Sequence, residues 1–81
     1  MLNFFYNLCL KNGKRVDNYY ELTVDLSQKA IAKITGTHYV TVCKLLAYLR
    51  NEGIMEKKGK DVKIYDLDKL RDLIEDEQLK Y

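Results

Sequence analysis

The sequence predicts one small, mainly α-helical domain with a single β-hairpin. Three observations support this fold class: apolar residues recur at helical spacing in four segments, two short alternating runs flank Gly59, and no proline interrupts the chain. The 81 residues leave no room for a second domain, so residues 1–81 are expected to form one unit. With 47% hydrophobic and 32% charged residues, the composition is that of an ordinary globular protein.

The first predicted helix covers residues 2–11 and ends at Asn12-Gly13, a pair typical of helix C-caps. Its apolar face consists of Phe5, Leu8 and Cys9. Apolar residues alternate only loosely over 14–25, so we expect a loop with a short strand in that segment.

Two further helices are predicted on either side of a tight turn. Ser27 is a suitable N-cap for a helix over 28–34. Gly36 allows a positive φ in the turn, and Thr37 is expected to cap a longer helix over 38–51. The apolar faces consist of Ala30, Ile31 and Ile34 in the first helix and of Val42, Leu45, Leu46 and Leu49 in the second.

The remainder of the chain predicts a hairpin and a closing helix. Alternating runs at 54–57 and 62–65 flank a turn that contains Gly59. The last helix covers about 66–79 and is acidic in its first turn, as the helix dipole favours. It would dock through Leu67, Leu70, Leu73 and Ile74.

A short helix, a tight turn and a longer helix, followed at once by a hairpin, form a winged helix-turn-helix. The helix-turn-helix covers about 27–51, the wing about 54–65 and the closing helix about 66–79. We therefore predict a three-helix core plus N-terminal and C-terminal helices, with the small β-hairpin as the wing.

Three stretches of the sequence carry a family resemblance. They are LSQKAIAKITG at 26–36, Val42-x-Lys44-x-Leu46-x-x-Leu49-x-x-Glu52-Gly53-Ile54, and VKIYDLDKLRDL at 62–73. In their order and spacing, and together with 2–13, they resemble the C-terminal DNA-binding domain of Crp–Fnr transcription regulators. The resemblance implies bacterial transcription regulation through sequence-specific binding to double-stranded DNA. The helix over 38–51 would enter the major groove and the basic wing would lie on the backbone.

The sequence departs from the family pattern in two ways. Family members usually carry an effector-binding β-barrel and a long dimerisation helix, so we expect this chain to be an excised domain rather than a stand-alone protein. They also often show an Arg-Glu pair where this chain has Tyr39-Val40, and Arg at the position of Lys44. Because Arg and Lys are not interchangeable at a bidentate guanine contact, an operator of the best-known family type is not expected.

The start of the 38–51 helix supplies the candidate base contacts: His38, Tyr39, Val40, Thr41, Cys43 and Lys44. Lys44 suits guanine acceptors and Val40 suits a thymine methyl group. Some of these residues also have a simpler interpretation. Thr41 would bond to its own helix, Cys43 would be a small neutral spacer, and His38 would be a solvated surface residue.

The candidate backbone contacts are Ser27, Gln28, Thr37, Lys57, Lys58 and Lys60. The first three lie at helix N-termini, where free N–H groups attract phosphate, and the lysines lie on the wing. The charge distribution agrees: residues 1–65 hold 11 Lys or Arg against 6 Asp or Glu, whereas residues 66–81 hold 3 against 6. A merely solvated hairpin tip is the alternative for the lysines, and Tyr48 is expected to pack against the domain.

Catalytic and metal sites have little support. Two cysteines and one histidine exclude a zinc finger or an iron–sulfur ligand set carried by this chain alone. Two reduced thiols are the simpler expectation, with a single disulfide left open. His38 and Cys43 lie about 140° apart on a helix, so they cannot form a nucleophile–base pair. We expect no enzyme activity and no cofactor in this chain.

The expected partner is double-stranded DNA, with RNA polymerase as a candidate for the full-length regulator. That regulator would be a cytoplasmic homodimer, whereas the isolated domain would be monomeric. No apolar run approaches the ~20 residues that span a bilayer, so no membrane association is expected. Two alternatives stay open: a winged helix used for protein interaction without DNA specificity, and a winged-helix regulator of another family such as the GntR type. The closing helix start at Asp66-Leu67-Asp68 argues against the GntR type.

Overall fold

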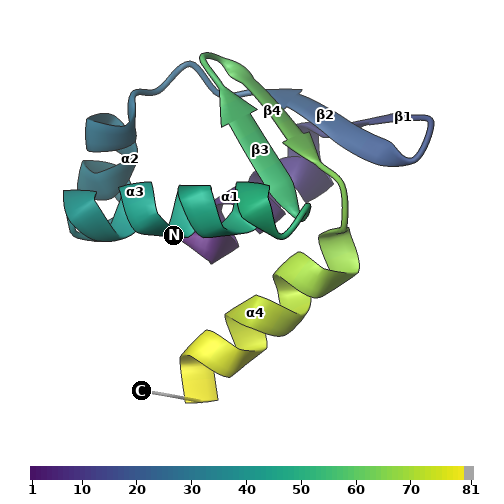
Figure 1. Cartoon of the computed structure of the whole chain (residues 1–81). Helices are drawn as coiled ribbons and strands as arrows, with labels where there is room; N and C mark the ends of the chain where they lie inside the picture. The colour runs from purple at the N-terminus through teal and green to yellow at the C-terminus, as the bar shows by residue number, and fades with distance from the viewer. Residues whose placement is uncertain (80–81) are drawn as a thin grey trace.

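The computed structural model describes the backbone of residues 1–79 and the side chains of residues 1–75. In chain order, its elements are α1 (Leu2–Asn12), β1 (Lys14–Val16), β2 (Tyr19–Thr23), α2 (Gln28–Thr35), α3 (Tyr39–Asn51), β3 (Met55–Lys58), β4 (Asp61–Ile64) and α4 (Leu67–Leu79) (Figure 1). The four helices lie where the helical spacing predicts them, and the β3–β4 hairpin lies at the predicted wing. Within the described residues, no helix is long and apolar enough to cross a membrane.

The strands form one antiparallel sheet with the order β1-β2-β4-β3. A second hairpin, β1–β2, therefore extends the wing, and the prediction of a loop with one short strand over 14–25 is wrong in this respect. Asp17 and Asn18 form the two-residue turn of this hairpin. Asp17 has a φ of 53°, a left-handed conformation that Asp and Asn tolerate better than most residues.

Side chains of opposite charge face each other across the sheet. The register places Lys14, Glu21, Lys63 and Glu56 in one row across the four strands. A directly opposed pair of unlike charges stabilises a sheet by roughly 0.2–1 kcal/mol. This row therefore favours the observed register over a shifted one.

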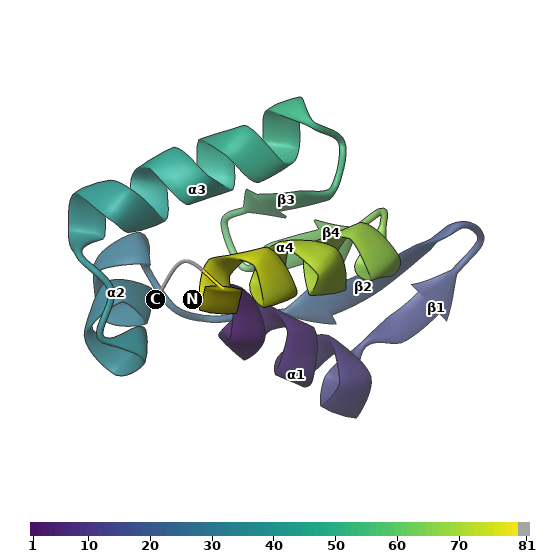
Figure 2. The ribbon, with the colours of Figure 1, turned by 90° about the horizontal axis from the view of Figure 1, so that it is seen from below.

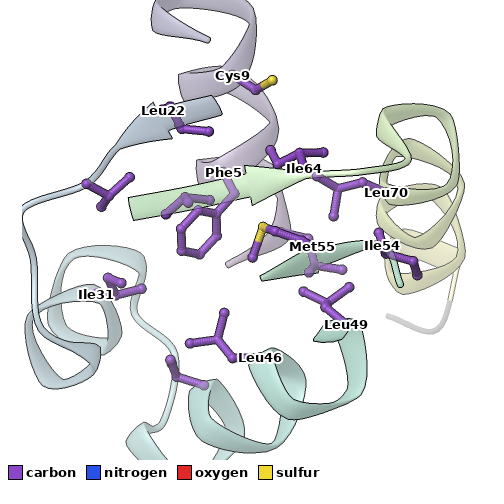
Figure 3. Packing of buried hydrophobic residues seen from close by; sticks show 14 of the residues in the cluster. Phe5, Cys9, Leu22, Ile31, Leu46, Leu49, Ile54, Met55, Ile64 and Leu70 are labelled. Carbon is purple, nitrogen blue, oxygen red and sulfur yellow. The ribbon is translucent and has the colours of Figure 1, made fainter. Parts of the chain in front are cut away.

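The core lies between the sheet and the helices, and its buried side chains come from all parts of the chain (Figure 3). The main contributors are Phe5 and Cys9 of α1, Ile31 of α2, Leu46 and Leu49 of α3, Leu70 of α4, and Leu22, Met55 and Ile64 of the sheet. Helices α1 and α4 lie side by side, and α3 runs along β3 (Figure 2). Among the described side chains every buried one is hydrophobic, so apolar packing alone holds the helices on the sheet.

The end of α1 owes its glycine to close packing. Gly13 has a φ of −68°, which any residue can adopt, so a left-handed cap does not explain it. A Cβ atom at this position would lie 2.4 Å from the carbonyl oxygen of Cys9. The Gly13 N–H donates to the same oxygen at 2.8 Å, and only a residue without a side chain fits so near it.

The helix-turn-helix pair differs from the prediction in two details. His38, rather than Thr37, caps α3: its Nδ1 accepts a hydrogen bond from the Val40 N–H at 3.4 Å. Thr37 instead belongs to the end of α2. Its N–H donates to the Ala32 carbonyl at 3.0 Å, and its Oγ1 accepts a hydrogen bond from the Thr35 hydroxyl at 3.0 Å.

The apolar face of α2 is also rotated relative to the prediction. Ile31 and Ala32 are buried, Ala30 is half-buried, and Ile34 is 59% exposed. The helix is only eight residues long. The buried face of α2 is therefore centred on Ile31 and Ala32, and Ile34 lies outside it.

Candidate nucleic-acid interface

The N-terminus of α2 is built as the sequence predicts. Ser27 accepts a hydrogen bond from the Ala30 N–H at 3.1 Å through its side-chain oxygen, which satisfies one of the free donors at the helix start. Ser27 is exposed and Gln28 is half-buried. At the other end, Gly36 takes a φ of 67°, and the chain then enters α3.

The first turns of α3 form an exposed surface that the core does not use. His38, Tyr39, Val40, Thr41 and Lys44 are all exposed, with 43% for Tyr39 and 51% for Val40. On the opposite side of the same helix, the buried residues are Val42, Leu46 and Leu49. The structure therefore brings together five of the six predicted base contacts on one accessible end of a helix.

The sixth predicted base contact, Cys43, lies in a different environment. Its side chain is half-buried, and Sγ donates a hydrogen bond to Oε1 of Gln28 on α2 at 3.0 Å. Cys43 thus joins the two helices of the motif. Within the described residues, Cys43 and Cys9 are both free thiols, in agreement with the prediction of reduced cysteines.

Tyr39 lies next to both the thiol and a lysine. The Nζ atom of Lys29 lies 5.9 Å from the centroid of the Tyr39 ring, within the range of a cation–π interaction. Hydrogen bonding and charge interaction with the Cys43 thiol raise the pKa of the Tyr39 hydroxyl above its ordinary value. Tyr39 therefore stays neutral at physiological pH, and its hydroxyl oxygen can still accept a hydrogen bond from a ligand.

The turn of the β3–β4 hairpin is tied to the segment just before α2. The Val24 N–H donates to the Lys60 carbonyl at 2.8 Å, and Lys60 Nζ lies 3.8 Å from Asp25 Oδ2. Gly59 takes a φ of 62° at the first position of this two-residue turn, as the twist of a hairpin requires. The turn of the wing and the start of α2 are therefore neighbours.

The three predicted wing lysines differ in their surroundings. Lys57 is half-buried, and its Nζ donates to the Gly59 carbonyl at 2.6 Å. Lys58 and Lys60 are exposed, and the contact of Lys60 with Asp25 is a weak one between two solvated groups. Lys58 and Lys60 are therefore the more accessible cations, whereas Lys57 stabilises the turn.

Lys29, Ile34 and Tyr48 are exposed residues of this region that were not among the predicted contacts. Lys29 follows Gln28 in the first turn of α2, and this position next to a predicted backbone contact could have identified it from the sequence. Ile34 was assigned to the core, and Tyr48, which we expected to pack against the domain, is 46% exposed. Helical spacing could not identify the last two, because each lies at the edge of an apolar face.

The described part of the chain shows no arrangement suited to metal binding: no three His, Cys, Asp or Glu side chains lie close enough to hold an ion. The accessible groups of this region are hydrogen-bond donors, cations and two exposed aliphatic side chains. The latter are Ile34 near the end of α2 and Val40 at the start of α3. Such groups fit an extended anionic ligand with apolar and hydrogen-bonding edges.

Comparison with known proteins agrees with this arrangement. The model of the Crp-like helix-turn-helix domain matches residues 1–73. The structure of oxidised CprK in complex with o-chlorophenolacetic acid shares 49% sequence identity and superposes with a TM-score of 0.85, covering 89% of this chain and 31% of CprK. Reduced CprK without any ligand shares 50% identity, with a TM-score of 0.85 and coverage of 89% and 35%.

A second regulator has the same architecture at lower identity. It is the CO-dependent transcription factor CooA from Carboxydothermus hydrogenoformans in its imidazole-bound form, with 28% identity, a TM-score of 0.81, and coverage of 88% of this chain and 33% of CooA. The chain thus spans about a third of the length of these solved proteins. Among curated proteins, no sequence matches it significantly.

Proposed function

This chain belongs to the Crp-like helix-turn-helix domain family and is a DNA-binding domain of a transcription regulator, and we propose that the exposed first turns of α3 read its operator. The observation that carries the proposal is the accessible end of α3, where five adjacent or near-adjacent side chains have no part in the core. In a helix-turn-helix, this end of the second helix enters the major groove.

The residue types on α3 suggest how bases are read. Lys44 would donate to the guanine O6 and N7 acceptors, and Val40 would pack on a thymine methyl group. His38, Tyr39 and Thr41 each offer a hydrogen-bond donor or acceptor toward a base edge or a phosphate. Tyr39 and Val40 stand where the family often has an Arg-Glu pair, so this operator would differ from the best-known family operators.

The backbone of the DNA would be held by the start of α2 and by the wing. Ser27, Gln28 and Thr37 lie near the starts of α2 and α3, where N–H groups favour phosphate. Lys58 and Lys60 extend this surface on the wing, with Lys57 as a support for the turn. Contacts of this class position the protein and carry no sequence information.

The whole regulator would act as a cytoplasmic homodimer on a two-fold symmetric site, with half-sites about one helical turn apart. RNA polymerase is its candidate partner at a promoter. The isolated 81-residue chain would be monomeric and would bind weakly, because one module makes few phosphate contacts. The family match and the solved neighbours lend no support to a protein-interaction module or to a GntR-type regulator. The solved neighbours are regulators rather than enzymes.

The test is a salt titration of duplex binding by the 81-residue chain. A duplex selected by the chain from a randomised library serves as the probe, and fluorescence anisotropy measures the Kd between low and moderate salt. The variant with Lys44, Lys58 and Lys60 all changed to Ala should bind at least about tenfold more weakly. It should also lose up to about 0.9 unit of the log–log salt slope for each phosphate contact removed.

The matched control is Lys69→Ala, which removes one exposed lysine from α4, outside the proposed interface. It should leave the Kd within a factor of two of that of the unchanged chain, and it should leave the log–log salt slope unchanged. Equal affinities of the triple variant and the unchanged chain would contradict the proposed interface.

A further inference from the structure

The Cys43–Gln28 contact joins α2 and α3 at the edge of the proposed DNA interface. The thiol donates to Oε1 of Gln28 at 3.0 Å, and both side chains are half-buried. Cys43 lies one helical turn after Tyr39 on α3. The sulfur is thus directed toward Gln28 on α2.

The contact uses only one end of the Gln28 amide. Oε1 is occupied by the thiol, whereas the amide nitrogen donates to no other group in the described part of the chain. Gln28 is the first residue of α2, beside the capped N-terminus at Ser27. A phosphate at this helix start would meet both the backbone N–H groups and the two N–H donors of the Gln28 side chain.

A glutamine side chain has three rotatable bonds and loses conformational entropy when it is held in one orientation. A hydrogen bond made before DNA arrives removes part of that loss from the binding step. The thiol hydrogen bond also determines which way the amide faces, since the thiol donates to the oxygen and leaves the nitrogen directed away. With its nitrogen directed away from the thiol, the Gln28 amide can donate a hydrogen bond to an anion.

We propose that Cys43 is a positioning residue for DNA binding: its thiol holds Gln28 so that the Gln28 amide donates to a backbone phosphate, and Cys43 itself reads no base. The inference rests on the proposed function and replaces the prediction that Cys43 is a base contact. On this proposal, only the exposed side chains of α3 read bases, and Cys43 and Gln28 act together in binding a phosphate.

The inference predicts a distinctive pattern of binding energies. Cys43→Ala should weaken binding about fivefold, which is part of the effect of losing one hydrogen bond to a charged group, because Gln28 keeps its amide and loses only its fixed orientation. Because a glutamine amide is neutral, no counterion is involved, and the salt slope should not change. The loss should be the same for the selected duplex, for duplexes with single base pairs changed, and for a scrambled duplex measured at lower salt.

Two further variants test the coupling between the residues. Cys43→Ser keeps a donor of similar size and should restore most of the affinity. Gln28→Ala should weaken binding about tenfold, and adding Cys43→Ala to it should cause little further loss, since the thiol then has nothing to position. Independent, multiplying losses would contradict the coupling.

Gln28→Glu separates DNA binding from folding. The carboxylate keeps an acceptor for the thiol and places a negative charge at a helix N-terminus, where it favours the helix. Thermal unfolding followed by circular dichroism should therefore show unchanged or raised stability, whereas DNA affinity should fall by more than in Gln28→Ala. Retained affinity in Gln28→Glu would overturn the proposed phosphate contact.

The outcomes also distinguish this inference from the proposed function. If the unchanged chain selects no duplex, the proposed function fails and the inference fails with it. If the chain binds DNA through Lys44 but Cys43→Ala alters the ranking of base-substituted duplexes, Cys43 reads a base and only the inference is overturned. The same holds if Cys43→Ala binds every duplex as tightly as the unchanged chain.

Discussion

Cys9 shows how a single buried residue ties stability to pH. Its side chain packs in the core on α1, and the carbonyl of the same residue accepts the hydrogen bond from Gly13 that ends the helix. Burial raises the pKa of the Cys9 thiol above its ordinary value of 9.0, because the thiolate would lie in an apolar environment. The folded chain therefore keeps this proton to higher pH than the unfolded chain does.

Stability should consequently fall at alkaline pH. The contribution is fully present below the unfolded pKa and is lost as the pH rises through the raised folded value. We expect the free energy of unfolding to decrease between about pH 8 and about pH 10, and to decrease less steeply in Cys9→Ala, which has no thiol to titrate. Urea denaturation at several pH values measures both curves. Parallel curves would show that Cys9 does not contribute.

The helices and strands show which features depend on local sequence. Ser27, Gly36 and Gly59 act within a few residues of their own position, and all three perform the predicted roles in the cap, the turn and the wing. Hairpin β1–β2 depends instead on pairing with β4, far along the chain. These three caps and turns could be predicted from the local sequence, whereas the pairing of β1–β2 with β4 could not.

The cap of α2 offers a test at this level. Ser27→Ala removes the side-chain acceptor for the Ala30 N–H and should lower the free energy of unfolding by about 1 kcal/mol. Thr23→Ala, an exposed change on the outer face of β2, should have a smaller effect and serves as the control. Chemical denaturation monitored by circular dichroism compares the two. Equal losses would mean that the cap adds nothing.

Most of the fold and much of the candidate site could be predicted from the sequence. Apolar spacing located all four helices and the wing, and it separated Val42 from the exposed residues of α3. What failed depends on geometry that spacing does not contain. Asp17-Asn18 lacks the glycine that usually marks a hairpin turn, and the environment of Cys43 depends on how α2 approaches α3. The base and backbone contacts themselves remain predictions.

Across the whole molecule, α4 stabilises the fold but carries none of the residues proposed to touch DNA. Helix α4 packs against α1, whereas α2, α3 and the wing turn carry the candidate contacts (Figure 2). Ile74 of α4 is buried in the same core as Leu49 of α3. A small defect at Ile74 should therefore lower stability without displacing the start of α3.

Ile74→Val tests this separation. The change removes one buried methylene group and should lower the free energy of unfolding by about 1 kcal/mol. The Kd for the selected duplex, measured at a temperature where the variant is fully folded, should stay within a factor of two. Val42→Ala is the comparison, because it removes packing from beneath the exposed start of α3 and, on the proposed function, should lower both stability and affinity. A large loss of affinity in Ile74→Val would show that the two regions are coupled.

The exposed start of α3 also has an evolutionary consequence. Substitutions at exposed positions outside special structural features usually change stability by no more than about 0.5 kcal/mol. Tyr39, Val40, Thr41 and Lys44 can therefore be exchanged one at a time while the chain stays folded. If these side chains read bases as proposed, single mutations at them would change the target site with no compensating change in the core. New DNA specificities would then arise without loss of the domain's architecture.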